Sequence, residues 1–219
     1  MLARRLSKIL CVGRNYAAHA AEMGSEVPKD PIIFFKAPSA LIGDGDPIVI
    51  PSWAGRVDYE GEIAVVVGRR ARHVPASEAW RYVSGIVALN DVTARELQRK
   101  DGQWARAKSF DSFCPVGTPV PLGLRDPESL EVVTRVNGEV RQHGRTSEMV
   151  FPIRYLIAYC SSFATLEEGD VLATGTPEGV GPLAPGDVVE VEVPGVGVVR
   201  NPVVAGKDSA PPLPSRTHG

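Results

Sequence analysis

Three carboxylates occupy alternate positions in the segment 57–67, at Asp58, Glu60 and Glu62. In a β-strand these side chains share one face, with successive members about 7 Å apart, so their like charges repel. The residues after Glu62 are apolar on both faces, which is typical of a strand covered on both sides. Carboxylates at the mouth of such a strand need a cation, and oxygen ligands without Cys or His favour Mg²⁺, Mn²⁺ or Ca²⁺ over zinc. A solvated strand face is the alternative interpretation of this pattern.

Asp91 offers a further oxygen ligand. The stretch SGIVALND is an apolar strand that ends at Asn90 and Asp91, where functional groups are commonly displayed. Thr93 and Glu96 have the spacing of a capping box, which predicts a helix that begins just behind Asp91. An Asx-type turn is an equally good interpretation of Asp91 taken alone.

A histidine and a lysine suggest proton transfer and oxyanion binding. The stretch GRNYAAHAAEMG places His19 and Glu22 three residues apart on a short predicted helix, where a carboxylate orients an imidazole and raises its basicity. Histidine is the usual general base near neutral pH. Lys108 is close in sequence to Phe110 and Phe113, so we expect its ammonium to be partly desolvated and available to an oxyanion. Each feature alone is also typical of a solvated surface.

Two more segments suit the binding of substrate oxygens. Arg95 and Gln98 share a helix face, which puts a carboxylate-binding group beside an amide donor. The segment 173–182, ATGTPEGVGP, packs glycines and prolines around Thr176, and this composition suits the presentation of backbone N–H groups to an anion. It matches no phosphate-binding fingerprint of the P-loop or dinucleotide type. Solvated helix residues and an ordinary tight turn are the alternatives.

The elements that must position these groups are mainly strands. β-branched runs between Gly and Pro predict strands at 32–36, 47–50, 57–67, 84–89, 131–136, 171–174 and 188–193. Asn137-Gly138 predicts a type I′ hairpin, since both central residues of that turn need positive φ. Short helices are predicted at 15–23, 77–83, 94–100 and 152–164. The fold class is therefore α+β, mainly β.

Composition excludes several classes of protein. With 219 residues, 43% of them hydrophobic, the chain can bury one sizeable core, and we expect a single domain over 1–205 with a polar, proline-rich tail at 206–219. Lys and Arg (24) nearly balance Asp and Glu (26), so no basic surplus is available for nucleic acid. No apolar run suits a bilayer span or a signal peptide, and we expect no membrane association. Three scattered cysteines without CxxC spacing fit a reducing cytoplasm rather than disulfides or a thiolate zinc site.

Six blocks, in this order, carry a resemblance to a known family: VGRNYAAHAAEMG, FFKAPSALIG, DYEGEIAVVVG, LNDVTARELQ, AKSFDSFCPVG and TGTPEGVG. Over residues 10–181 the chain is similar to the fumarylacetoacetate hydrolase family in its short, single-domain form. The resemblance implies a β-roll of mixed sheets, usually a homodimer. It also implies that Glu60, Glu62 and Asp91 bind a divalent metal.

The same resemblance assigns further roles. It implies that His19 and Glu22 form a catalytic dyad on a lid that orders over the substrate. Contacts with substrate oxygens are expected from Lys108, Arg95, Gln98, Thr176, Gly175 and Arg14.

The family resemblance also implies a chemistry. Its members cleave C–C bonds in acylpyruvates, decarboxylate oxaloacetate, or isomerise and hydrate 2-oxo-dienoic diacids, and a metal-stabilised pyruvate enolate is common to these reactions. We therefore expect a Mg²⁺-dependent C–C hydrolase of acylpyruvate-type 2,4-dioxo acids, with Mn²⁺ or Ca²⁺ as alternative ions. In hydrolysis His19, oriented by Glu22, would deprotonate a water that attacks the distal carbonyl, with Lys108 or Gln98 stabilising the oxyanion, so Lys108 is expected to be catalytic as well. A 2-hydroxyhepta-2,4-diene-1,7-dioate isomerase is the alternative within the family, and a non-catalytic divalent-metal-binding β domain is the alternative outside it.

Overall fold

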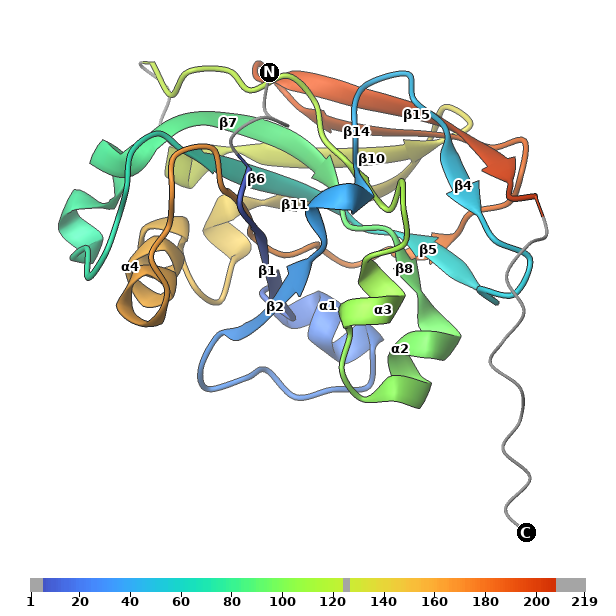
Figure 1. The fold of residues 1–219 in the computed structure, drawn as a ribbon, viewed down its shortest axis with the longest axis horizontal. Helices are drawn as coiled ribbons and strands as arrows, with labels where there is room; N and C mark the ends of the chain where they lie inside the picture. The colour runs from blue at the N-terminus through green and yellow to red at the C-terminus, as the bar shows by residue number, and fades with distance from the viewer. Residues whose placement is uncertain (1–5, 124–126, 208–219) are drawn as a thin grey trace, which may run out of the picture.

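The computed structural model describes residues 6–123 and 127–207, and Figure 1 shows their arrangement. From residue 208 onward, the tail expected at 206–219 lies outside the described residues.

A five-stranded mixed sheet positions most of the predicted site residues. Its order is β2 (Ile32–Lys36), β1 (Ile9–Gly13), β12 (Val171–Ala173), β6 (Gly61–Val67) and β7 (Val83–Asn90). Strands β1 and β12 are parallel, and the other neighbours are antiparallel. The sheet is buried on both faces, since Ile63 and Val65 of β6 join one apolar cluster while Ala64 and Val66 join another. The prediction that this strand is covered on both sides after Glu62 is confirmed.

A second five-stranded sheet packs on the first. Its order is β11 (Glu139–Arg145), β10 (Glu131–Val136), β14 (Val188–Val193), β15 (Gly197–Ala205) and β4 (Ile48–Ile50). Val132, Val191 and Val199 of this sheet share the largest apolar cluster with residues of β6 and β7, so the main core lies between the two sheets. Asn137 and Gly138 have φ values of 53° and 82° between β10 and β11, which confirms the predicted hairpin.

Smaller elements complete the described part of the chain. A three-stranded sheet contains β13 (Gly181–Pro182), β5 (Val57–Tyr59) and β8 (Thr93–Ala94), and a two-stranded sheet contains β3 (Leu41–Ile42) and β9 (Cys114–Pro115). The α-helices are α1 (Ala17–Glu22), α2 (Arg95–Asp101), α3 (Ala105–Lys108) and α4 (Ile153–Phe163). Short 3₁₀ helices are η2 (Pro38–Ala40), η3 (Ala76–Tyr82), η4 (Pro127–Ser129) and η5 (Thr146–Glu148). In Figure 1, α1, α2 and α3 gather on one side of the sheets, apart from α4.

The predicted class, α+β with mainly mixed β-sheets, is confirmed, with local differences. The strand predicted at 57–67 is interrupted at Glu60, and its halves β5 and β6 belong to different sheets. The segment predicted as a helix at 77–83 is the 3₁₀ helix η3, in which Glu78 N–H donates to Pro75 O, three residues back. Strand β15 was not predicted because it contains Gly197 and Pro202, and it forms by pairing with β14 and β4.

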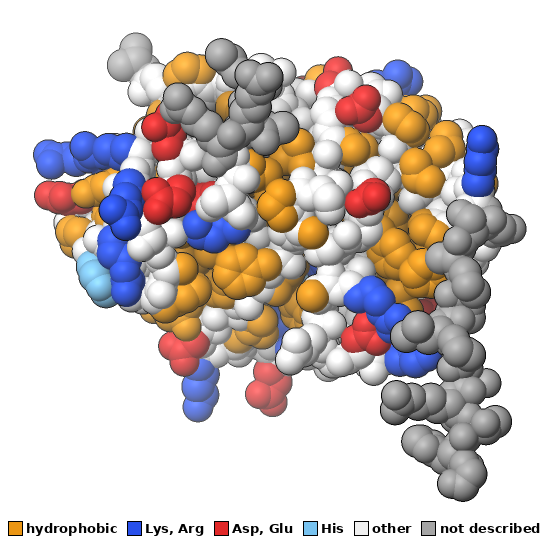
Figure 2. Space-filling model, viewed as in Figure 1, with side chains coloured by type: hydrophobic (Ala, Val, Ile, Leu, Met, Phe, Trp, Pro, Cys, Tyr) orange, Lys and Arg blue, Asp and Glu red, His pale blue; other side chains and the backbone are white. Residues whose placement is uncertain are grey.

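The surface reflects the near balance of charge. On the face seen in Figure 2, Lys and Arg side chains are interspersed with Asp and Glu. Within the described residues, no helix has the length and apolar character needed to cross a membrane.

Candidate active site

The three predicted metal ligands converge inside the protein. Glu60, Glu62 and Asp91 are buried, and one carboxylate oxygen from each lies within 4.8 Å of the others. One backbone and one side-chain hydrogen bond bring them together: the Asp91 N–H donates to Glu60 O at 2.8 Å, and the Glu60 N–H donates to the side-chain Oδ1 of Asn90 at 2.9 Å. In a continuous strand the carboxylate side chains would be spaced along one row. The interruption between β5 and β6 brings them together instead.

Asp58, the first acid of the predicted row, has different partners. Its carboxylate accepts hydrogen bonds from Arg56 Nε at 2.7 Å and from Arg95 Nε at 2.8 Å. Because β5 belongs to the three-stranded sheet, the row predicted on one strand face does not extend to Asp58. This residue orients Arg95 instead.

Three buried cations neutralise Glu60 and Asp91. Lys108 Nζ lies 2.7 Å from Glu60 Oε2 and 2.6 Å from Asp91 Oδ2, and Lys36 Nζ lies 2.6 Å from Asp91 Oδ1. Arg95 pairs with Glu60 Oε1 at 2.7 Å. Burial alone would raise the pKa of Glu60, but the charges of Lys108 and Arg95 hold it well below its usual value. Burial alone would lower the pKa of Lys108, but Asp91 and Glu60 raise it.

Glu62 has no ion-pair partner among the described residues. Its Oε2 accepts the Gly175 N–H at 2.8 Å. Burial, followed by the charges of Asp91 and Glu60, raises the pKa of Glu62 well above its usual value. A hard divalent cation would relieve this repulsion, and an all-carboxylate donor set is of the type that binds one. The residues present therefore fit the predicted metal site.

His19 and Glu22 lie on α1 within hydrogen-bonding reach of each other. His19 Nδ1 is 3.3 Å from Glu22 Oε2, and the Gly179 N–H donates to the two oxygens of Glu22 at 3.1 and 3.2 Å. The segment 173–182 therefore presents backbone N–H groups, as its composition indicates, to the protein carboxylates Glu62 and Glu22.

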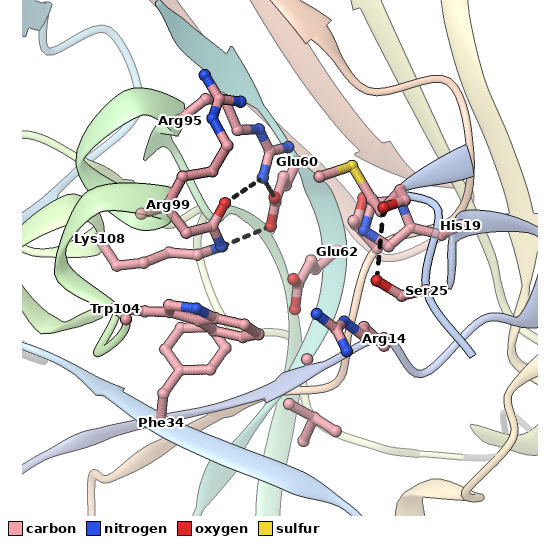
Figure 3. A pocket seen from close by; sticks show the side chains of 16 residues that line it. Arg14, His19, Ser25, Phe34, Glu60, Glu62, Arg95, Arg99, Trp104 and Lys108 are labelled. Carbon is pink, nitrogen blue, oxygen red and sulfur yellow. Dashed lines mark hydrogen bonds and ion pairs between the residues drawn. The ribbon is translucent and has the colours of Figure 1, made fainter. Parts of the chain in front are cut away.

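A cavity of about 360 Å³ opens onto these groups. It is lined by most of the predicted site residues, namely Arg14, His19, Glu60, Glu62, Arg95, Gln98, Lys108 and Thr176. Figure 3 shows Lys108 and Arg14 on opposite sides of Glu62. Asp91, Glu22 and Gly175 do not line the cavity, but each makes a hydrogen bond or ion pair with a residue that does. Segments distant in the sequence thus form one site.

Two of the residues expected to bind substrate also make hydrogen bonds within the protein. Arg95 donates to Gln98 Oε1 at 3.0 Å, which leaves the Gln98 amide nitrogen as a donor for a substrate oxygen. The Thr176 hydroxyl donates to Gly61 O at 2.9 Å and accepts from Gln142 Nε2 at 2.8 Å. Thr176 therefore holds the segment 173–182 against the start of β6 as well as lining the cavity.

Known proteins are similar to this chain in sequence and fold. Residues 8–204 match the family model for the fumarylacetoacetate (FAA) hydrolase C-terminal domain. The chain belongs to the fumarylacetoacetate hydrolase family. It is 46% identical over 199 residues to the mitochondrial oxaloacetate tautomerase FAHD1 of Arabidopsis thaliana, with 89% of each chain covered.

Solved structures of the fumarylacetoacetate hydrolase family agree with the fold. The 5-carboxymethyl-2-hydroxymuconate delta-isomerase from Mycobacterium smegmatis matches with a TM-score of 0.86 and 49% identity, over 93% of this chain and 80% of that one. The 2-hydroxyhepta-2,4-diene-1,7-dioate isomerase from Mycobacterium marinum matches with a TM-score of 0.84 and 44% identity, over 92% and 76%. The family resemblance found in the sequence is confirmed, and the three relatives named above are a tautomerase and two isomerases.

Lys36 is a site residue of this family member that the sequence pattern did not reveal. It ends β2, is buried, and also donates to Val92 O at 3.1 Å. The signal present in the sequence was the position of this lysine directly after the apolar run IIFF, because a buried ammonium needs an anionic partner.

Lys108 is desolvated as predicted, but by a ring from another segment. Its Nζ lies 4.9 Å from the ring centroid of Phe34, which in turn packs edge-on against Trp104 at 5.2 Å. The sequence neighbours Phe110 and Phe113 pack against each other, with centroids 5.0 Å apart. Phe34 and Trp104 both line the cavity, and no local pattern marked either one.

The capping box predicted at Thr93 and Glu96 is wrong. The N-cap of α2 is Ala94, which makes no side-chain cap bond, and the Thr93 hydroxyl donates to Asp91 O at 2.8 Å. Thr93 pairs with Asp58 in the three-stranded sheet, so a tertiary contact overrides the local helix signal.

Proposed function

We propose that this protein is a divalent-metal-dependent enzyme that shifts protons in small 2-oxo acids, as a tautomerase or isomerase. The observation that carries the proposal is the convergence of Glu60, Glu62 and Asp91 beside a cavity that also holds Lys108 and Arg14. Carboxylates alone would repel an anionic substrate, whereas cations on the cavity wall attract it. The similarity to an oxaloacetate tautomerase and to two isomerases supports proton transfer as the reaction.

The site has groups that suit both the 2-oxo oxygen and the 1-carboxylate of a 2-oxo acid. Mg²⁺ or Mn²⁺ held by Glu60, Glu62 and Asp91 would act as a Lewis acid on the substrate's 2-oxo oxygen. The Lys108 ammonium lies between Glu60 and Asp91, where it adds positive charge as negative charge grows on that oxygen. The Gln98 amide is available to donate to the 1-carboxylate.

His19 is the residue best placed to move the proton. Its Nδ1 faces Glu22, so Nε2 is the nitrogen that accepts a proton from C3 of the substrate. Glu22, fixed by the Gly179 N–H, stabilises the imidazolium that forms. Return of this proton to the 2-oxygen gives the enol. In a 2-hydroxy-2,4-diene the proton instead leaves the 2-hydroxyl group and is added at C5, which gives the 2-oxo-3-ene isomer.

C–C hydrolysis of acylpyruvates is a second candidate, favoured by the same His19–Glu22 pair. An oriented imidazole also deprotonates water, which would then attack the distal carbonyl. Both reactions pass through the same enolate and differ in whether a nucleophile is added.

A panel of substrates tests the proposal. Oxaloacetate tautomerisation, acetylpyruvate cleavage and isomerisation of 2-hydroxyhepta-2,4-diene-1,7-dioate are measured with Mg²⁺, with Mn²⁺ and with EDTA. We expect fast tautomerisation or isomerisation that EDTA abolishes. If acetylpyruvate cleavage is much the fastest, the second candidate replaces the first. If metal-loaded protein turns over none of the three, both are wrong.

We further propose a homodimer in a reducing compartment such as the cytoplasm, without nucleic-acid or membrane partners. The buried free thiols of Cys11, Cys114 and Cys160 support a reducing compartment. Light scattering should give about twice the chain mass of 23.4 kDa, and a monomer would contradict the proposed assembly.

A further inference from the structure

The loop between β12 and β13 is held at its two ends by different groups. At its start, the Thr174 N–H and hydroxyl both donate to Ile63 O of β6, at 3.2 and 2.7 Å. The buried Asn15 side chain also donates to Thr174 O at 2.7 Å. The next residue, Gly175, donates its N–H to Glu62. The first part of the loop, with its contact to a predicted metal ligand, therefore has anchors of its own.

The second part of the loop is held by a glutamine from the other large sheet. Side chains alternate along β11, and Gln142 faces inward, where it is 1% exposed. Its Nε2 donates to Thr176 Oγ1 and to Pro177 O, both at 2.8 Å. Its Oε1 accepts the N–H of Gly61, the first residue of β6, at 2.9 Å. One buried amide thus joins the loop to the strand that carries Glu62.

Gly179 links this second part of the loop to the proposed proton-transfer pair. The Tyr59 hydroxyl donates to Gly179 O at 2.9 Å, and the Gly179 N–H donates to the Glu22 carboxylate, which faces His19. The φ of Gly179 is +90°, and a Cβ there would collide with Arg141 O, so only bare backbone fits against β11. The orientation of Glu22 therefore depends on how firmly the loop is held at this point.

We propose that Gln142 and Tyr59 are positioning residues for the proposed general base, His19. They fix the second part of the loop, and its Gly179 N–H in turn holds the Glu22 carboxylate that orients the imidazole. This inference rests on the proposed function, in which His19 accepts the substrate proton. Neither Gln142 nor Tyr59 lines the cavity, so both act through the loop rather than on the substrate.

The separate anchors of the loop predict which property of the enzyme changes. When Gln142 or Tyr59 is replaced, the first part of the loop keeps its own contacts and its hydrogen bond to Glu62. Gly61 stays paired with Asn90 of β7. We therefore expect the proton-transfer step to be impaired while Mg²⁺ binding is retained.

The test measures kcat for oxaloacetate tautomerisation and the calorimetric Mg²⁺ affinity in wild type, Gln142→Met and Tyr59→Phe. Methionine fills the space of glutamine without its hydrogen bonds, and phenylalanine lacks only the hydroxyl. We expect kcat to fall about tenfold or more in Gln142→Met, because a small misplacement of a catalytic group lowers the rate steeply. In Tyr59→Phe we expect a fall of about three- to tenfold, as for one lost hydrogen bond.

A second background, Glu22→Ala, shows whether these effects pass through the carboxylate. Without Glu22 the loop has no carboxylate to hold, so Gln142→Met and Tyr59→Phe should lower kcat little further. Equal fold losses in the two backgrounds would overturn the proposal, because the replaced side chains would then act through another group, such as Thr176. A Mg²⁺ affinity that falls as much as kcat would also overturn it, since the metal ligands would then be the groups that move.

Thr134→Val is the matched control. Thr134 is the cross-strand neighbour of Gln142 on β10, is equally buried and packs against Gly61, but its hydroxyl has no hydrogen-bond partner among the described residues. Valine has nearly the same shape, so this variant should keep the wild-type kcat and Mg²⁺ affinity. A loss like that of Gln142→Met would assign the effect to packing between the two sheets and contradict a positioning role.

Nuclear magnetic resonance of the His19 ring separates this question from the proposed function. Its signals are identified among those of the four histidines by their loss in His19→Ala. We expect Gln142→Met and Tyr59→Phe to move these signals toward their positions in Glu22→Ala, whether or not the wild type turns over a 2-oxo acid. Thr134→Val should leave them in place.

Unchanged His19 signals in Gln142→Met and Tyr59→Phe would refute the proposal even if both variants lose activity. Melting curves establish that each variant is folded. If Gln142→Met does not fold, Tyr59→Phe decides by the same criteria, because it removes one hydroxyl and leaves every hydrogen bond of Gln142 intact.

Discussion

Replacement of Lys36 by methionine should destabilise the protein most when metal is withheld. Lys36 Nζ lies 2.6 Å from Asp91 Oδ1, and the two side chains are 0% and 1% exposed. Removal of one partner from a buried ion pair costs about 3 to 5 kcal/mol. Because Lys108 still neutralises Asp91 at 2.6 Å, we expect the lower end, about 3 kcal/mol. For a chain of this length, that loss lowers Tm by about 6 to 12 °C.

A divalent cation beside Asp91 would replace part of the charge that Lys36→Met removes. Mg²⁺ should therefore raise the Tm of Lys36→Met more than that of wild type, each compared with its value in EDTA. Thermal melts and denaturant unfolding at pH 7 supply both numbers.

Lys8→Met is the matched control for Lys36→Met. Lys8 pairs with the buried Asp170 at 2.5 Å, but Lys8 itself is 22% exposed and does not line the cavity. Because Asp170 keeps its hydrogen bonds from Ser7 and the Glu167 N–H, the loss of Lys8 should cost about 1 kcal/mol without a Mg²⁺ effect. If Mg²⁺ raises Tm by the same amount in Lys36→Met and in wild type, the ion does not replace the charge that Lys36 places beside Asp91. A loss of stability in Lys36→Met no larger than that in Lys8→Met would refute the estimate from burial.

Three other outcomes are expected. His19→Ala should slow tautomerisation and acylpyruvate hydrolysis by about 10²-fold but slow oxaloacetate decarboxylation much less, since that reaction needs no base. The surface variant His143→Ala is its control, and equal loss of all three activities would show that His19 acts in a step common to them, such as closure over the substrate. Gly13→Ala would place a Cβ 2.7 Å from Trp104 and, by displacing the ring, should lower turnover about tenfold or more, whereas full turnover in a folded variant would show that the ring position is unimportant. Burial alone would raise the pKa of Asp170, but hydrogen bonds from Lys8, Ser7 and the Glu167 N–H lower it, so its ionised form stabilises the fold above about pH 4 and this contribution fades as pH falls through the lowered pKa. Asp170→Asn should therefore cost more free energy of unfolding at pH 7 than at pH 3, and a cost independent of pH would contradict this role.

The acidic cluster was predictable because its signals are local. Glu60 and Glu62 alternate at the mouth of an apolar strand, and Asp91 ends the next apolar strand. Their convergence depends on a register that the sequence does not state, in which the Asp91 N–H bonds to Glu60 O. The same register removes Asp58 from the cluster, and the strand pattern gave no sign of this interruption.

Residues that act across long sequence separations were not predictable from local patterns. Lys36 reaches Asp91 across 55 residues, and Asn15 reaches Thr174 across 159. Trp104 precedes α3, outside any periodic pattern, and becomes part of the cavity wall through contact with Phe34 and the backbone of Gly13. These roles follow from packing between elements, for which propensity and spacing carry no information.

The most direct test titrates Mg²⁺ into metal-free protein by calorimetry and follows ketonisation of enol-oxaloacetate in the same samples. Glu62→Gln is the informative variant, because glutamine can still accept the Gly175 N–H and the ion pairs of Glu60 and Asp91 stay intact. We expect wild-type turnover to rise with the fraction of protein that has bound Mg²⁺, and Glu62→Gln to lower both the Mg²⁺ affinity and turnover by about tenfold or more. Full turnover in EDTA, or unchanged Mg²⁺ affinity in folded Glu62→Gln, would contradict a metal site at Glu60, Glu62 and Asp91.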